Sequence, residues 1–121
     1  MGGKSRTKGK GGERELAAEL TRLFGCAARR GVQYSGGPDS PDVVIDIPGL
    51  HIECKRKERL SLYAALDQAE RDAGEQKLPV VMHRSNRRPW VAIVRLDDLM
   101  TLAKTLVAGS ADSKQDADPI V

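Results

Sequence analysis

Apolar residues occupy every second position on either side of Pro48-Gly49, in the segment from Asp42 to Lys55. This alternation is typical of strands, so the segment predicts two β-strands joined by a tight turn. Period two places Asp42 on one face of the first strand, and Glu53 and Lys55 on the corresponding face of the second. A two-residue loop would set Asp42 opposite Lys55, whereas a bulge would shift the pairing by one residue. We therefore expect three charged groups in one patch of the hairpin.

Three other segments carry apolar residues at helical spacing, and a glycine follows each stripe. They predict a helix from Gly12 to Gly25, a second over residues 62–73 with Ser61 as its N-cap, and a third from Leu96 to Gly109. The predicted inward residues are Leu16, Ala17, Leu20, Leu23 and Phe24 in the first helix, Leu62, Ala65, Leu66, Ala69 and Ala73 in the second, and Leu96, Leu99, Met100, Ala103, Leu106 and Val107 in the third.

Apolar runs at residues 26–34, 79–84 and 90–95 predict three further strands, the last two apolar enough to lie inside a sheet. The predicted order is helix, three strands, helix, two strands, helix. This order indicates an α/β domain in which a mixed five-stranded sheet is flanked by helices.

The two ends of the chain lack apolar periodicity. Residues 1–11 predict a flexible basic arm, residues 12–108 a folded domain, and residues 109–121 a polar, disordered tail. No apolar run is long enough to cross a membrane, and the N-terminus lacks the apolar stretch of a signal peptide. The two cysteines, Cys26 and Cys54, are too few for a disulfide scaffold or a zinc site. We expect a cytoplasmic protein without a membrane partner.

The net charge of +3 conceals an uneven distribution, because the last twelve residues are acidic and the remainder is more basic. Clusters of this kind suit a polyanion such as a nucleic-acid backbone, or they solvate a surface. The basic clusters are Lys4, Arg6, Lys8 and Lys10; Arg29 and Arg30; Lys55, Arg56, Lys57 and Arg59; and Arg84, Arg87 and Arg88.

Carboxylates on adjacent strands, such as Asp42 and Glu53, can bind a hard divalent cation, and Lys55 adds a positive charge beside them. Phosphodiester hydrolysis uses such an arrangement, although a salt bridge across the hairpin would have the same pattern. Glu13 continues the apolar stripe of the first helix, so it either points toward this patch or serves as an ordinary dipole-stabilised helix end. Gln68 borders the stripe of the second helix, where a polar residue is usually surface.

The combination of motifs resembles a known family. Gly12-Glu13-Arg14-Glu15-Leu16, Ser35-Gly36, Pro41-Asp42-Val43-Val44 and Ile52-Glu53-Cys54-Lys55 occur in the order seen in PD-(D/E)xK nucleases. They resemble most closely the archaeal-type Holliday-junction resolvases, over about residues 9–95. The resemblance implies a restriction-endonuclease-like fold, a homodimer, and branched DNA as the partner. It also implies Mg²⁺ as the cofactor, with Mn²⁺ able to substitute.

The resemblance also implies roles for individual residues. Asp42, Glu53 and the main-chain carbonyl of Cys54 match metal ligands, and Glu13 matches a helix glutamate that reaches the same metal. Lys55 matches the catalytic lysine. The residues expected to contact DNA are Arg29, Arg30, Ser35, Arg56, Lys57, Gln68, Arg87 and Arg88.

Three functions are compatible with these residues. The first is a metal-dependent endonuclease that resolves four-way junctions in DNA recombination or repair. The second is a nicking or restriction-type nuclease acting on duplex, flap or single-stranded DNA. The third is a DNA-binding protein that has this fold without catalysis, in which loss of Glu53 would leave function intact.

Overall fold

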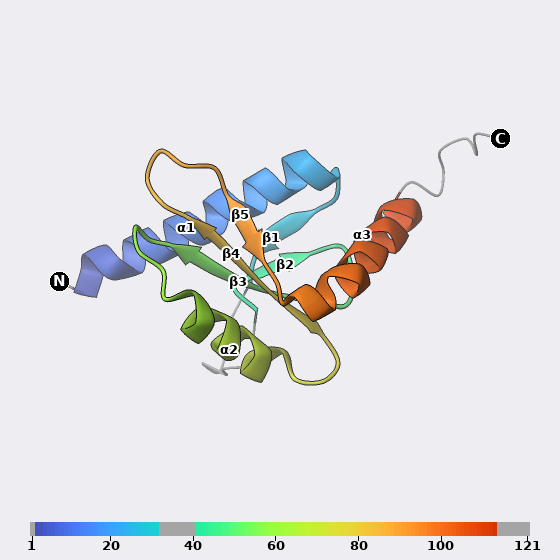
Figure 1. Cartoon of the computed structure of the whole chain (residues 1–121). Coiled ribbons are helices and arrows are strands. Elements are labelled where there is room, and N and C mark those ends of the chain that lie inside the picture. Colours follow the sequence, from blue (N-terminus) through green and yellow to red (C-terminus); the bar gives the residue numbers. More distant parts are fainter. Residues whose placement is uncertain (1, 32–40, 114–121) are drawn as a thin grey trace.

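A five-stranded mixed sheet with helices on both faces forms the centre of the computed structural model, which describes residues 2–31 and 41–113 (Figure 1). The strands follow one another across the sheet in chain order, antiparallel except for the parallel pair β3–β4 that α2 connects. The predicted α/β fold class is confirmed. The elements are α1 (Gly2–Phe24), β1 (Ala28–Arg30), β2 (Val43–Ile45), β3 (Leu50–Arg56), α2 (Leu62–Ala73), β4 (Leu78–Arg84), β5 (Val91–Ile93), η1 (Leu96–Asp98) and α3 (Leu99–Ser113).

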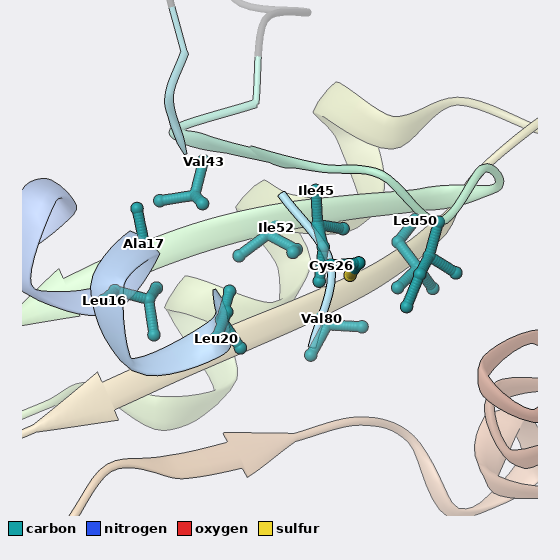
Figure 2. Close-up of a cluster of buried hydrophobic side chains, with 10 residues drawn as sticks. Leu16, Ala17, Leu20, Cys26, Val43, Ile45, Leu50, Ile52 and Val80 are labelled. Atoms are coloured by element: carbon teal, nitrogen blue, oxygen red, sulfur yellow. The ribbon is translucent and has the colours of Figure 1, made fainter. Parts of the chain in front are cut away.

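The larger part of the core lies between α1 and the sheet. Leu16 and Leu20 of α1 pack against strand residues that include Ile52 and Val80, and Figure 2 shows these side chains pointing toward one another. Leu16 and Ile52 are each only 1% exposed. Burial of such side chains is the main favourable contribution to folding, so this contact fixes α1 on one face of the sheet.

The opposite face of the sheet packs against α2. Ala65, Leu66 and Ala69 of α2 contact Val81, the neighbour of Val80 in β4. Successive residues of a strand point to opposite faces. Val80 therefore belongs to the half of the core under α1, and Val81 to the half under α2. Because Glu53 pairs with Val81 in the β3–β4 register, its side chain lies on the α2 face.

The register of β2 and β3 differs from the predicted hairpin. Val43 pairs with Ile52, which makes the connection a four-residue loop, Asp46 to Gly49, instead of a two-residue turn at Pro48-Gly49. The predicted pairing of Asp42 with Lys55 is therefore wrong by two residues. A shift of two preserves the faces of a strand, so Asp42 still shares a face with Glu53.

The first and last helices extend beyond their predicted limits. α1 begins at Gly2, so residues 2–11 are helical in the structure and were wrongly predicted as a flexible arm. α3 continues to Ser113, and Gly109 is not a helix stop. It is buried against Ile47, since a Cβ at Gly109 would lie 2.6 Å from the Ile47 Cγ2.

The buried side of α3 also differs from the prediction. Leu102 and Leu106 pack against the core, whereas Leu99, Met100 and Val107 are at least half exposed. The helix therefore presents one apolar strip to the sheet and a second to its surroundings. None of the helices in the described part of the chain is long and apolar enough to span a membrane.

Four smaller predictions are corrected. β5 is an edge strand and not an interior one, because the sheet ends there. Ser61 precedes α2 but makes no side-chain capping bond, and Leu62 is 40% exposed and not inward. The first strand is shorter than predicted, and residues 32–34 lie outside the described part of the chain.

Candidate active site

Two carboxyl groups meet at the end of the sheet where β2 begins. Asp42 immediately precedes β2, and Glu53 lies on the same face of β3. The Cys54 backbone N–H donates to Asp42 Oδ2 at 2.8 Å, and the β2–β3 register sets the Asp42 and Glu53 carboxyl groups on the same face of neighbouring strands. The Asp42 side chain therefore accepts a hydrogen bond that a backbone carbonyl of a neighbouring strand would otherwise accept. This bond holds the Asp42 carboxyl group beside Glu53.

The pair is electrostatically asymmetric. Burial first, and then the like charge of Glu53, raise the pKa of Asp42 to about 7, against the opposing effect of the Cys54 N–H. Burial also acts to raise the pKa of Glu53, but the interactions with His51, Asp42 and Lys55 outweigh it and keep that pKa below its ordinary value. Asp42 is therefore the member of the pair that more readily holds a proton.

Lys55 follows Glu53 by two residues and lies on the same face of β3. Its Nζ donates to Gln68 Oε1 at 3.3 Å, and its positive charge helps to lower the pKa of Glu53. Gln68 projects from α2, which covers this face. The structure thus brings the lysine and the glutamine together beside the carboxyl pair.

Glu13 approaches from α1 but is engaged elsewhere in this structure. Its Oε1 accepts a hydrogen bond from Arg30 Nε at 2.7 Å, at the end of β1. Its negative charge makes the smallest contribution to the raised pKa of Asp42. Glu13 thus lies near the carboxyl pair while Arg30, expected to contact DNA, neutralises it.

Glu15 of α1 forms ion pairs with residues of two strands. Its carboxylate lies between two arginines, Arg56 at 3.4 Å and the closer Arg84. Arg56 is the last residue of β3 and Arg84 the last residue of the parallel strand β4, so both lie at the same end of the sheet. Glu15 of α1 reaches both of them there. The three-residue contact ties α1 to the edge that carries the candidate site.

Basic side chains surround this edge. Arg56 also donates to Asn86 Oδ1 at 3.1 Å, which joins β3 to the β4–β5 loop, and the loop lies beyond the end of β4 in Figure 1. Lys57, Arg87 and Arg88 are exposed there, and Arg29 is exposed on β1. Most of the residues expected to contact DNA therefore lie at or near one end of the sheet, while Ser35 lies outside the described residues.

Two residues that the sequence did not single out lie next to Glu53. His51 is 1% exposed, and its Nε2 lies 2.8 Å from Glu53 Oε1. One ligand atom each of His51, Glu53 and Asp72 falls within 4.8 Å of the others. The period of β3 already placed His51 on the Glu53 face, so His51 could have been found from the sequence, whereas the approach of Asp72 is a tertiary contact that the sequence does not show.

The Cys54 thiol is a poor ligand. Burial first, and then the negative charge of Asp42, raise its pKa to about 12. Since the thiolate is the form that binds metal, Cys54 could contribute to a metal site only through its main chain.

Folding thus gathers at one sheet end the residues that the sequence separates, Pro41-Asp42 on one strand and Glu53-Cys54-Lys55 on the next. Such an arrangement is that of a PD-(D/E)xK nuclease. Comparison with family models agrees, since residues 4–113 match the family described as "Phage putative PDDEXK endonuclease", and the chain belongs to this family. Neither the curated proteins nor the solved structures with which the chain was compared gave a match. The chain is a nuclease with DNA as its substrate, and nucleases of this superfamily use divalent metal ions.

Proposed function

We propose that the protein is a divalent-metal-dependent endodeoxyribonuclease that hydrolyses phosphodiester bonds, with Mg²⁺ as its cofactor and Mn²⁺ as a substitute. The observation that carries this proposal is the placement of Asp42 and Glu53 on one face of neighbouring strands, with Lys55 on the same face of β3. Two adjacent acids, one buried and one half-buried, repel one another, and a cation is the ligand that they attract most strongly.

The donor set fits Mg²⁺. Carboxylate and carbonyl oxygens are its preferred protein ligands, and the ion usually retains several waters. The N–H and C=O of one strand residue point to the same edge, so the Cys54 carbonyl faces β2, as does the N–H that binds Asp42. Asp42, Glu53 and this carbonyl would hold the ion, which polarises a phosphoryl oxygen and lowers the pKa of the attacking water when bound.

Lys55 would act on the reacting groups directly. Its hydrogen bond to Gln68 restrains the Nζ beside Glu53, where the ammonium group can orient the attacking water and neutralise charge that develops on the phosphate. Gln68 would be a positioning residue. Glu13, once released from Arg30, would add a carboxylate to the same end of the sheet.

The basic edge would hold the DNA backbone over this site. Lys57, Arg87 and Arg88 are exposed, and phosphate contacts position a protein without selecting bases. This pattern favours a substrate recognised by shape. Together with the order of motifs shared with Holliday-junction resolvases, it supports a four-way junction as the substrate.

A junction resolvase needs two active sites, so we also propose a homodimer. The exposed strip of α3, with Leu99, Met100 and Val107, is a surface of the kind that associates with another apolar surface. Sedimentation velocity should give the mass of two chains, and a monomer that nevertheless nicks duplex DNA would favour the second function named above.

The substrate proposal is tested by incubating the protein with a labelled four-way junction, a flap and a linear duplex of the same sequence, with Mg²⁺ or with EDTA. We expect symmetric paired nicks in the junction, with Mg²⁺ alone. Faster cleavage of the duplex or the flap would mean that this DNA, and not the junction, is the preferred substrate. Metal-independent binding of all three, with no cleavage, would leave only the non-catalytic function.

A further inference from the structure

A compact group of potential metal ligands lies between β3 and α2 and includes Glu53. It consists of His51, Glu53 and Asp72, whose ligand atoms all lie within 4.8 Å of one another. His51 is 1% exposed and Glu53 is 4% exposed, whereas Asp72 is half-buried. The group thus combines a buried imidazole with two carboxylates, and Asp72 connects it to the surface.

The fold itself brings these three residues together. His51 and Glu53 share a face of β3 because they are two residues apart, and α2 covers that face. Asp72 lies in the last turn of α2, next to the buried Ala73 and three residues after the buried Ala69. Its carboxylate is therefore directed to the edge of the α2–β3 contact.

The geometry of the group sets the Asp72 carboxylate and the buried His51 ring against the same side chain, that of Glu53. A histidine so deeply buried needs a partner for its ring nitrogen, and here that partner is the Glu53 carboxylate at 2.8 Å.

We propose that His51 Nε2, Glu53 and Asp72 form a second divalent-cation site, selective for a transition-metal ion over Mg²⁺. Imidazole nitrogen suits Zn²⁺, Co²⁺ and related ions, whereas Mg²⁺ prefers oxygen ligands. Ligand bonds of about 2.0–2.2 Å allow opposite donors to lie roughly 4 Å apart, so a small closure of the group suffices. A metal ion binds an imidazole nitrogen that carries no proton, so the ion would take the place of the hydrogen bond between His51 Nε2 and Glu53.

Glu53 would belong to both sites, so the second ion would lie beside the proposed nuclease metal. The new site does not depend on catalysis, since its ligands can bind a cation whether or not DNA is cut. If it is occupied, Glu53 is held by a metal ion on one side and remains available to the Asp42 site on the other.

The test is a titration of the full-length, metal-free protein with Co²⁺ alone. Calorimetry measures the affinity, and visible absorption reports nitrogen ligation. We expect His51→Gln and Asp72→Asn each to weaken Co²⁺ binding about ten-fold or more and to alter the visible spectrum. Asp67→Asn, a matched change at an exposed aspartate of α2, should bind Co²⁺ as the unaltered protein does. In Asp72→Asn, the loss of Mg²⁺ affinity should be much smaller than the loss of Co²⁺ affinity.

Unchanged Co²⁺ affinity and spectrum in Asp72→Asn would overturn the proposal, and His51 would then be only a hydrogen-bond partner that positions Glu53. Asp72 is half-buried, so this variant carries the test even where His51→Gln fails to fold. Cleavage of DNA with Mg²⁺ is measured separately. Loss of cleavage with intact Co²⁺ binding contradicts the proposed function alone, and the reverse contradicts the second site alone.

Discussion

Asp42 lies beside Glu53 on one face of the sheet, with its Oδ2 accepting the Cys54 backbone N–H at 2.8 Å. An acid that immediately precedes one strand is thus anchored to the backbone of the next. Burial first, and then the like charge of Glu53, raise the pKa of Asp42 to about 7. The Asp42 carboxyl group is consequently a source of both function and instability.

The first prediction concerns stability and pH. Unfolded, Asp42 ionises near 3.8, and folded, near 7, so ionisation removes stability as pH rises through that window. Asp42→Asn keeps the acceptor for Cys54 and a donor for Glu53 but cannot ionise. We expect the variant to be more stable than the unaltered protein at pH 8, by on the order of 1–2 kcal/mol, with the difference vanishing toward pH 4.

Urea unfolding at both pH values, without metal, measures this difference. Added Mg²⁺ should raise the midpoint of the unaltered protein and not that of Asp42→Asn. A variant that is less stable at pH 8 would show that the two carboxyl groups do not repel one another.

The second prediction separates the lysine from its partner. Lys55→Ala removes the charge beside the reacting phosphate and should slow cleavage about 100-fold or more. Gln68→Ala leaves that charge in place but frees the Nζ, so we expect a loss of roughly ten-fold. Single-turnover cleavage rates measure both, with Lys77→Ala, an exposed lysine beyond α2, as the control. Equal rates for Lys55→Ala and the control would remove the lysine from the mechanism.

The third prediction concerns the β4–β5 loop. Arg88→Ala should weaken binding of uncleaved DNA and reduce the slope of log affinity against log salt by about one. Arg87 has a positive φ of 62°, so Arg87→Asn, which tolerates this conformation, is the better variant and should act similarly. Lys104→Ala, on exposed α3, is the control. Fluorescence anisotropy in EDTA over a range of salt concentrations measures the slopes, and slopes equal to the control's would place the DNA elsewhere.

The fourth prediction concerns the contact that fixes α3. Gly109→Ala would place a methyl group 2.6 Å from the Ile47 Cγ2, and we expect it to lower the free energy of unfolding by about 1–3 kcal/mol. Gly11→Ala meets no atom within 4 Å in α1 and should raise it by about 0.5–1 kcal/mol. Thermal unfolding of both variants checks these signs, and a neutral Gly109→Ala would mean that α3 does not pack on Ile47.

The faces of the sheet could be predicted from sequence because the strand period is two. Asp42 and Glu53 share a face in any register shifted by an even number of residues, so the site was predicted although the turn was not. The loop is longer because Asp46 donates its N–H to the Ala27 carbonyl and Ile47 is buried. These are tertiary contacts, which a local pattern of turn residues does not contain.

Other features depended on partners distant in sequence. The ion pair of Glu13 with Arg30 and the position of Glu15 between Arg56 and Arg84 arise where different elements meet at one sheet edge. Glycine is a residue that commonly ends a helix, but the fold shows that Gly109 instead leaves room for the Ile47 side chain. The strand period of two predicts that His51 shares a face with Glu53. Its proximity to Asp72 of α2 could not be predicted from that period.

The most direct test of the proposed active site is the rate at which Glu53→Gln cleaves labelled DNA with Mg²⁺. Glu53→Gln keeps the shape of the side chain but removes the charge next to Asp42, so metal binding and cleavage should both be lost, by about 1,000-fold in rate. DNA binding should persist or tighten, since a negative charge near phosphate is removed. Glu75→Gln, at an exposed site, should cleave normally. Cleavage by Glu53→Gln at the rate of Glu75→Gln would contradict the active site proposed for this nuclease.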